Sequence, residues 1–452
     1  MHLLAASVVA AVAGLAAGAS CAVPTPVVNE FDVARKIGDW ETKYTRTDPM
    51  HVNRAAETAL TNSPTSKVAG AAFDRLAIIF FENTDFEKAR GDRESRVRSV
   101  HLTLTPAAAN FDFFAKKGIT LTNYYGVTHP SQPNYMAAIA GDYFGMNHDE
   151  FLRAPKNIST VVDLLESKKI SWGHYQENMP FSGFEGKRWK PRDDPKNYYV
   201  RKHNPAVLHD SVASSKERLA LIKNVSMTHT ESSLFHRDLA NDLLPQWMFI
   251  TPGMWSDGHD SDVTTAGEWL RKFLEPLLEN KKFMKRTLVL ITFDEAEVYS
   301  RRNRVLSVLL GDAVPEHLVG TEDPNYYNHY SQIATVSANW DLPTLGRWDV
   351  GANILKMVAD RTGDKLRKWP SEEELQSRYW NESYAGAFHD KSERVFPMPN
   401  LALTRNSHTK RPILKSIIEQ YAKSGAPTYY EDTIEVPEGL RPPRGYAPSG
   451  SR

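Results

Sequence analysis

Short apolar runs alternate with amphipathic stretches along the chain after about residue 70. Five runs, rich in β-branched and aromatic residues and too short for helices, are predicted strands: LAIIFF (76–81), ITLTNYYG (119–126), ISWGHYQ (170–176), QWMFIT (246–251) and TLVLITF (287–293). Helical patterns stand between them at 107–117, after Thr105-Pro106, and at 160–169, 210–224 and 265–283, the last expected to bend at Pro276. Such alternation predicts an α/β fold with a mostly parallel sheet and helices on both faces.

The same pattern suggests how the chain is divided. We expect a polar lead-in over 23–70, one large domain over 71–430, and a flexible C-terminal tail over 431–452, which is rich in Pro, Gly, Ser and Arg. Residues 181–209 and 299–345 break the alternation with Pro, Asn, Tyr and charged side chains. They are interpreted as insertions or loops over one face of the domain.

Residues 1–22 carry no charged side chain and end in small residues, which predicts a secretory signal peptide. Cleavage could follow Ala17-Gly18-Ala19 or Ser20-Cys21-Ala22, and the second choice would remove the single cysteine and leave a mature chain without a disulfide. An uncleaved membrane anchor is the alternative, although no later stretch offers the roughly 20 apolar residues of a transmembrane helix. Together with the glycosylation sequons at Asn157, Asn224 and Asn381, this favours a secreted glycoprotein, extracellular or in the cell wall.

The charge balance argues against polyanionic partners. Lys plus Arg number 55 and Asp plus Glu number 55, so the formal net charge is zero and no strong field attracts nucleic acid or an anionic membrane. We therefore expect no nucleic-acid partner and no stable membrane association. Protonation of the 15 histidines gives a weak lean toward an acid-side optimum.

Polar residues follow four of the predicted strands. These are Glu82-Asn83, the segment from Thr128 to Asn134, the segment from Asp257 to Asp260, and Asp294-Glu295. In an open parallel sheet, ligands bind beyond the carboxyl ends of the strands, so these residues are expected to meet. The carboxylates of Glu82, Asp294 and Glu295 with the amide oxygen of Asn83 suit a divalent metal ion, which could be Ca, Mg, Mn or Zn.

Further candidates surround this set. Ser159 and Thr160 precede a predicted helix, where free N–H groups favour an anion and a hydroxyl could act as a nucleophile; an ordinary helix cap is the alternative. His129, His203 and His259 lie in polar turns and could bind phosphoryl oxygens or protonate a leaving group. The weaker candidates are His148, His174, His209 and His329.

Several motifs together resemble the phosphoesterase family, which groups secreted fungal acid phosphatases with bacterial and plant phospholipases C. They are ENTD (82–85), THPSQPNYMAAIAGD (128–142), NISTVVDLLESKKISWGHYQENMP (157–180), RKHNP (201–205), DGHDSD (257–262) and TFDEAE (292–297). The resemblance covers most of residues 73–355. It implies an alkaline-phosphatase-like α/β fold and a metal-dependent hydrolase site.

The resemblance also implies roles for individual residues. Glu82, Asn83, Asp294 and Glu295 would be metal ligands or their near neighbours, and Thr160 the nucleophile, with Ser159 one residue earlier as the fallback. His129, His203 and His259 would be catalytic, and substrate binding would involve Ser159, Asn134, Lys202 and Asp257. Since Asn157 is a sequon three residues before Thr160, we expect it to be unmodified or to point away.

These observations predict a secreted acid phosphatase that hydrolyses small phosphate monoesters through a metal-activated hydroxyl and a phosphoenzyme intermediate. A phosphodiesterase of the phospholipase C type is the alternative, because the same residues could cleave a phosphodiester. The shapes of 181–209 and 299–345 would decide whether the pocket has room for a second ester group. A non-catalytic carbohydrate-binding protein, suggested by 10 Trp and 18 Tyr, ranks third.

Overall fold

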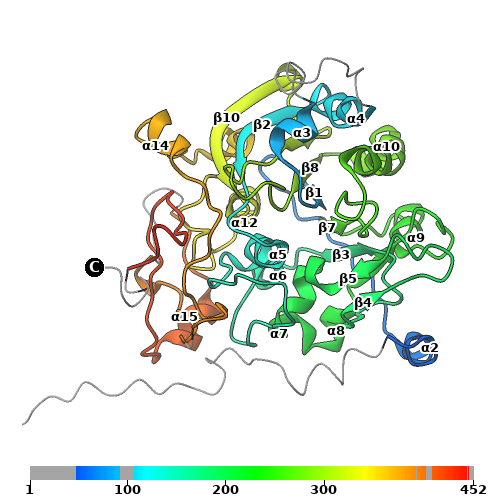
Figure 1. Ribbon diagram of the computed structural model, residues 1–452, viewed down its shortest axis with the longest axis horizontal. Helices are drawn as coiled ribbons and strands as arrows, with labels where there is room; N and C mark the ends of the chain where they lie inside the picture. The colour runs from blue at the N-terminus through cyan, green and yellow to red at the C-terminus, as the bar shows by residue number, and fades with distance from the viewer. Residues whose placement is uncertain (1–46, 92–105, 393, 404–409, 445, 447–452) are drawn as a thin grey trace, which may run out of the picture.

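The computed structural model describes residues 47–91, 106–392, 394–403, 410–444 and 446 of the 452-residue chain (Figure 1). The expected signal peptide, residues 1–22, lies outside the described residues, as does the lead-in up to residue 46. Within the described ranges, no helix has the length and apolar character needed to cross a bilayer.

The centre of the molecule is an eight-stranded sheet. Its strands run in the order β10 (Thr321–Asn328), β2 (Ile119–Tyr125), β9 (Ser307–Leu310), β8 (Thr287–Phe293), β1 (Arg75–Phe81), β7 (Trp247–Thr251), β3 (Trp172–Glu177) and β6 (Ile222–Val225). Neighbouring strands are parallel except where β9 pairs antiparallel with β2 and β8. The predicted α/β fold with a mostly parallel sheet is confirmed, and the five predicted strands correspond to β1, β2, β3, β7 and β8.

Helices cover both faces of this sheet. One face carries α3 (Phe86–Arg90), α4 (Pro106–Ala115), α10 (Val263–Glu279, with Pro276 inside it) and α11 (Lys281–Met284). The other carries α5 (Ser131–Ala140), α6 (Val161–Ser167), α12 (Tyr330–Asn339) and α13 (Lys356–Thr362), and Figure 1 shows α5, α6 and α12 on the side of the strands away from α4 and α10. Because both faces are covered, the central strands read as continuous apolar runs, with all seven residues of β8 buried.

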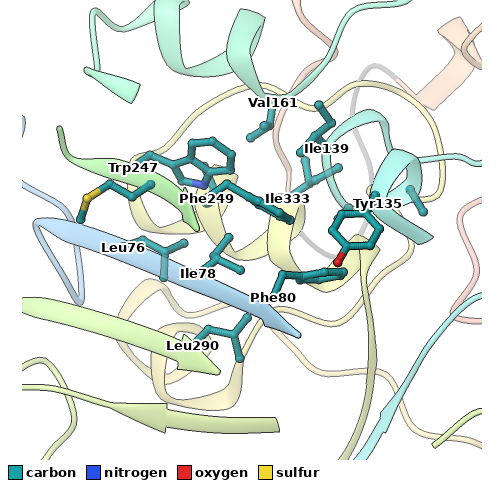
Figure 2. Close-up of a cluster of buried hydrophobic side chains, with 14 of the residues drawn as sticks. Leu76, Ile78, Phe80, Tyr135, Ile139, Val161, Trp247, Phe249, Leu290 and Ile333 are labelled. Carbon is teal, nitrogen blue, oxygen red and sulfur yellow. The ribbon is translucent and has the colours of Figure 1, made fainter. Parts of the chain in front are cut away.

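The core fixes where α5 lies relative to the sheet. Figure 2 shows side chains of α5, α6 and α12 packed over those of β1 and β7, with Tyr135, Ile139, Val161 and Ile333 above Leu76, Ile78, Phe80, Trp247 and Phe249. The rings of Phe80 and Tyr135 are 4.9 Å apart, and those of Phe80 and Phe249 are 5.1 Å apart. This packing holds the first turn of α5 at the carboxyl end of β1.

Two sequence interpretations need correction. The stretch 210–224, predicted as one helix, forms α7 (Asp210–Ala213), α8 (Lys216–Leu219) and then strand β6, because Ser215 caps a new helix. The region 299–345, interpreted as loops, contains β9, β10 and α12. All ten residues of α12 are buried and none is charged, so no charged, solvent-facing stripe marks it as a helix. Region 181–209 holds a small hairpin of β4 (Arg188–Trp189) and β5 (Tyr199–Val200) and short 3-10 turns.

The remaining helices lie at the periphery: α2 (Pro49–Thr58), α9 (Leu234–Ala240), α14 (Glu372–Gln376) and α15 (Lys415–Tyr421). The described part of the expected tail, 431–444, packs against the domain. Glu438 is buried and its carboxylate accepts a 2.6 Å hydrogen bond from the Trp380 N–H, while the Gly439 N–H donates to the Glu382 carbonyl at 2.7 Å. Backbone groups paired in this way tie the segment to residues 380–382.

Candidate active site

Three carboxylates meet at the carboxyl edge of the sheet. Glu82 follows β1, and Asp294 and Glu295 follow β8; the two strands are parallel neighbours with Phe81 opposite Phe293. One oxygen from each carboxylate lies within 4.8 Å of the others, and none of the three residues is more than 2% exposed. Three carboxylates so close and so deeply buried are compatible with a divalent cation, which would offset their mutual repulsion.

The pKa shifts in the cluster also favour a bound cation. Burial raises the pKa of Asp294 and of Glu295 well above the usual range, and the charge of Glu82 adds to both shifts. The Oδ2 atom of Asp294 is buried without a hydrogen-bond partner among the described residues. Burial alone would also raise the pKa of Glu82, but the positive charges of His203 and Lys202 outweigh it and lower that pKa below its ordinary value.

Asn83 joins the cluster through its backbone. Its N–H donates a 2.8 Å hydrogen bond to Asp294 Oδ1, and its φ of 50° is in the left-handed region, which Asn tolerates better than most residues. The turn at Asn83 therefore helps to hold Asp294 in place. A role for its side chain as a metal ligand stays a prediction.

A serine that the sequence analysis did not single out lies in the middle of the site. Ser131 is the first residue of α5, and its Oγ is 2.5 Å from Glu82 Oε1 and 3.1 Å from Glu295 Oε1. At this position the dipole of a ten-residue helix favours negative charge. Ser131 belongs to the segment 128–134, which was noted as a strand end, and its place at the start of a helix that was not predicted was the signal available.

The three predicted histidines converge on the same carboxylates. His203 Nε2 is 3.2 Å and His259 Nε2 is 3.9 Å from Glu82 Oε1, while His129 Nδ1 is 2.5 Å from Glu295 Oε2. The side chain of His259 is 32% exposed, whereas those of the other two are at most 2% exposed. His259 is thus the histidine of the three that reaches solvent.

Two of the residues predicted to bind substrate lie beside these histidines. Lys202 Nζ is 4.0 Å from Glu82 Oε1 and 2.9 Å from Asp149 Oδ2. Asp257 Oδ1 accepts a 2.8 Å hydrogen bond from the His259 N–H, and its Oδ2 is 3.4 Å from His203 Nδ1. Asp257 therefore orients the two histidines.

The geometry gives Asn134 a different task from the predicted one. Its Oδ1 accepts from the Val127 N–H at 2.8 Å, and its Nδ2 donates to the Thr128 carbonyl at 2.7 Å and to the Pro130 carbonyl at 3.1 Å. The amide is fully buried, so its hydrogen-bonding groups serve the backbone that carries His129. Asn134 shapes the loop and does not face the cluster as a substrate contact.

Thr160 and Ser159 also lie elsewhere. Thr160 is fully buried as the N-cap of α6, where its Oγ1 accepts a 3.2 Å hydrogen bond from the Val162 N–H, so the helix-cap alternative describes it. Arg347 Nη1 donates both to the Ser159 carbonyl at 2.8 Å and to the carbonyl of Ala140, the last residue of α5, at 2.7 Å. With a rise of about 1.5 Å per residue, that end of α5 is roughly 13 Å from Ser131.

Among the weaker histidines, His329 lies nearest the cluster. Its Nε2 is 2.6 Å from the backbone oxygen of Asp294, and its ring packs on Phe80 at 5.0 Å. It therefore lies behind the carboxylates, on the core side. His174 is buried within β3, and His209 is buried at the turn 205–209, where its Nδ1 is 2.9 Å from the Pro205 carbonyl oxygen. His148 lies in the turn at 145–150.

Comparisons with known proteins identify the family of the chain. The model of the phosphoesterase family matches residues 27–343. A phosphate-repressible acid phosphatase of Penicillium chrysogenum is 49% identical over 354 residues, which cover 78% of this chain and 79% of that protein. An acid phosphatase of Aspergillus fumigatus is 44% identical over 382 residues, 84% of this chain and 79% of that one.

Solved structures show only distant likeness. A protein of the alkaline phosphatase superfamily from Vibrio parahaemolyticus aligns with a TM-score of 0.36 at 11% identity, over 65% of this chain and 75% of that chain. By the extent of the family match and the identity to its relatives, the chain belongs to the phosphoesterase family.

Proposed function

We propose that the protein is an acid phosphatase that hydrolyses small phosphate monoesters, with Ser131 as the nucleophile. The observation that carries this is the position of the Ser131 hydroxyl, at the start of α5 and in hydrogen-bonding contact with both Glu82 and Glu295. Relatives named acid phosphatase, 43–49% identical over at least 75% of the chain, support the same activity.

Glu82, Asp294 and Glu295, together with Asn83, are the residues that would hold a divalent metal ion. They fit such an ion because the donors are oxygens, the carboxylates lie within 4.8 Å of one another, and Asp294 Oδ2 is a buried acceptor without a partner among the described residues. A bound cation would supply the positive charge that stabilises the phosphoryl group as charge develops on it.

Ser131 would attack the phosphorus atom in line with the ester oxygen that leaves. The Oγ–P bond forms and the P–O ester bond breaks, while the Ser131 proton passes to one of the two carboxylates that already accept its hydrogen bond. His259, the most exposed of the three histidines, would give a proton to the departing alcohol.

The second half of the reaction releases phosphate. His259 accepts a proton from a water molecule, the water oxygen attacks phosphoserine, and the P–Oγ bond breaks. Ser131 regains its proton from the carboxylate, and inorganic phosphate leaves. The protein ends in its starting state, with one water consumed for each ester cleaved.

His203 and Lys202 would bind the nonbridging phosphoryl oxygens. Burial alone would lower the pKa of His203, but the charge of Glu82 and the hydrogen bond to Asp257 outweigh it and raise the pKa above its ordinary value. The same competition, with Glu82 and Asp149 opposing burial, raises the pKa of Lys202. Lys202 is therefore positively charged, and His203 holds its proton to a higher pH than an ordinary histidine does, as phosphate binding requires.

Secretion belongs to the same proposal. The uncharged stretch 1–22 and the sequons support it, and N-terminal sequencing of protein recovered from culture medium would test it by locating the first residue of the mature chain.

A comparison of two substrates tests the activity. The purified protein is assayed from pH 3 to pH 9 with p-nitrophenyl phosphate, a monoester, and bis(p-nitrophenyl) phosphate, a diester. We expect kcat/KM to be at least about 100-fold higher for the monoester. A preference for the diester, or release of phosphocholine from phosphatidylcholine, would favour the phospholipase C alternative, and no turnover of either would remove the enzymatic function.

A further inference from the structure

A C-terminal segment that the family match does not include touches the candidate active site. Asn381 lies beyond residue 343, where that match ends, and it follows the buried residue Trp380. Its Nδ2 donates to two backbone carbonyls, that of Tyr299 and, at 2.5 Å, that of Arg301. The turn at 299–301 comes directly after the Asp294-Glu295 strand end.

Tyr299 connects this turn to a catalytic candidate. Its ring stacks on the imidazole of His129, with the ring centres 3.8 Å apart and the planes at 28°. At the edge of the same imidazole ring, His129 Nδ1 is 2.5 Å from Glu295 Oε2. One chain of contacts therefore runs from Asn381 through Tyr299 and His129 to Glu295.

Asn381 also faces His129 directly. The Asn381 side chain lies within hydrogen-bonding reach of the His129 imidazole. His129 Nε2 and Asn381 Oδ1 are both buried, and neither accepts or donates a hydrogen bond among the described residues. The two atoms are thus the natural partners of one another, which would fix the imidazole from the side opposite Glu295.

The segment that carries Asn381 is itself held on both sides. Ser383 Oγ is 2.6 Å from Thr128 Oγ1 and donates to the Met146 carbonyl at 2.7 Å. The Asn303 N–H donates to the Tyr379 carbonyl at 2.9 Å. These bonds keep Asn381 at a defined place between the 299–303 turn and the 128–130 loop.

We propose that Asn381 is a positioning residue of the active site, which holds the Tyr299 turn against His129 and thereby keeps His129 on Glu295. This rests on the proposed function, since it assumes that the residues around Glu295 act on the phosphate ester. It also gives the sequon Asn381-Glu382-Ser383 a structural use. Because a glycan on Nδ2 would replace one of its two N–H bonds, we infer that Asn381 is unglycosylated in the active protein.

Kinetics of protein made in a bacterium, where no glycan attaches, test the positioning role. Asn381→Ala should lower kcat for p-nitrophenyl phosphate about tenfold or more, because a displaced active-site group costs rate steeply. Its KM should change less than about threefold, because His203, His259 and Lys202 lie around Glu82 and none of them contacts Asn381 in the described structure. Asn381→Asp keeps Oδ1, the atom assigned to His129 Nε2, but loses both bonds that Nδ2 donates to the Tyr299 and Arg301 carbonyls. It therefore separates the contact with His129 from the contacts with the turn.

A double-mutant cycle and a control complete the test. Tyr299→Leu should lower kcat similarly, and Asn381→Ala/Tyr299→Leu should be little worse than either alone, because both changes release the same turn. Asn241→Ala is the matched control. Asn241 is the exposed C-cap of α9, and its side chain donates to the Arg237 carbonyl. It precedes the start of β7 and so lies away from the carboxyl ends of the strands, where the site is. The substitution should leave kcat and KM unchanged.

The failures of the two proposals are distinguishable. If His129→Ala loses activity about 100-fold or more while Asn381→Ala keeps wild-type kcat, the positioning role is wrong and the proposed function stands. If Asn381→Ala loses kcat only in proportion to a fall in Tm, the residue is merely structural. If Ser131→Ala is also fully active, the nucleophile assigned in the proposed function is wrong, and if the wild type turns over neither ester, the proposed function itself fails.

Discussion

Ser131 Oγ lies 2.5 Å from Glu82 Oε1, although 49 positions separate the two residues in the chain. Their distance is set one layer below the site, where Tyr135 of α5 packs against Phe80 of β1 with ring centres 4.9 Å apart. Tyr135 also stacks on His203 at 4.8 Å, with planes 9° apart. Apolar packing between helix and strand therefore aligns the hydroxyl, the carboxylate and a histidine at once.

Ser131→Ala should lower kcat/KM for p-nitrophenyl phosphate by at least about a thousandfold, because removal of a covalent nucleophile leaves only binding and electrostatic stabilisation. The substitution deletes a single oxygen from a helix N1 position, so the Tm should stay close to that of the wild type. Acid quenching during turnover of a 32P-labelled monoester should trap label on the wild-type protein and none on the variant. Label retained at full level would assign the nucleophile to another residue.

Thr160→Val should affect stability and leave catalysis intact. The substitution removes the Oγ1 that caps α6, and loss of an N-cap costs about 1 kcal/mol of the free energy of unfolding. Urea unfolding measures that cost, and kcat per folded molecule should equal that of the wild type. Thr160→Ser, which keeps the capping oxygen, is the control. A thousandfold loss of kcat in folded Thr160→Val would return the nucleophile to Thr160.

Asp294→Asn should change the response of the protein to metal. In chelator-treated protein, this substitution keeps the shape of Asp294 and removes a carboxyl whose ionisation burial and Glu82 oppose, so the Tm should rise relative to equally treated wild type, and more so at higher pH. In metal-loaded protein the wild type should have the higher Tm, because it binds the metal with the Asp294 carboxylate, which the variant lacks. Metal content by mass spectrometry, with Tm and activity, checks both. An unchanged wild-type Tm on chelation and reloading would argue against a metal at this site.

The apolar pattern was sufficient to predict the fold class. β1 and β8 are buried on both faces, so LAIIFF and TLVLITF are continuous apolar runs, and the rule that ligands lie at the carboxyl ends of strands then brings Glu82 and Asp294-Glu295 together. By contrast, all ten residues of α5 are buried, and a helix buried on all sides has no amphipathic period. Without α5, Ser131 looked like one polar residue of a turn.

Thr160 was misleading for a related reason. A hydroxyl before an amphipathic helix satisfies both the requirements of a cap and those of an anion site, and only the three-dimensional arrangement separates the two. α6 begins near the far end of α5, where Arg347 bridges Ser159 and Ala140. The contribution of Asn381 was likewise invisible, since contacts across 82 positions between Asn381 and Tyr299 leave no local pattern.

Two buried histidines should make the protein sensitive to acid. His174 lies in β3 between Trp247 and Phe249, with ring centres 5.3 Å and 5.4 Å away, and neither of its nitrogens has a partner among the described residues. Burial lowers the pKa of His174 from 6.5 to about 3, and burial lowers that of His209 to about 4. Both side chains are therefore neutral in the folded protein down to strongly acid pH.

The sign of the effect follows from proton binding. As the pH falls below 6.5 the unfolded chain takes up a proton on each histidine, while the folded protein does not until the pH reaches 3 to 4. Stability is thus fully present above pH 6.5 and is lost between there and the folded pKa values. Each histidine contributes a slope approaching about 1.4 kcal/mol per pH unit.

His174→Leu should flatten this acid limb. Leucine has a similar volume, does not titrate and suits the aromatic surroundings, so the free energy of unfolding in urea should fall less steeply from pH 6.5 to pH 4 than in the wild type, by up to about 1.4 kcal/mol per pH unit. His317→Gln is the control, because His317 is exposed and its replacement should leave the slope unchanged. Parallel curves for His174→Leu and the wild type would show that the protonation of His174 does not limit stability in acid. In that case His174 and His209 would have to be protonated through a local opening of the structure before the whole protein unfolds.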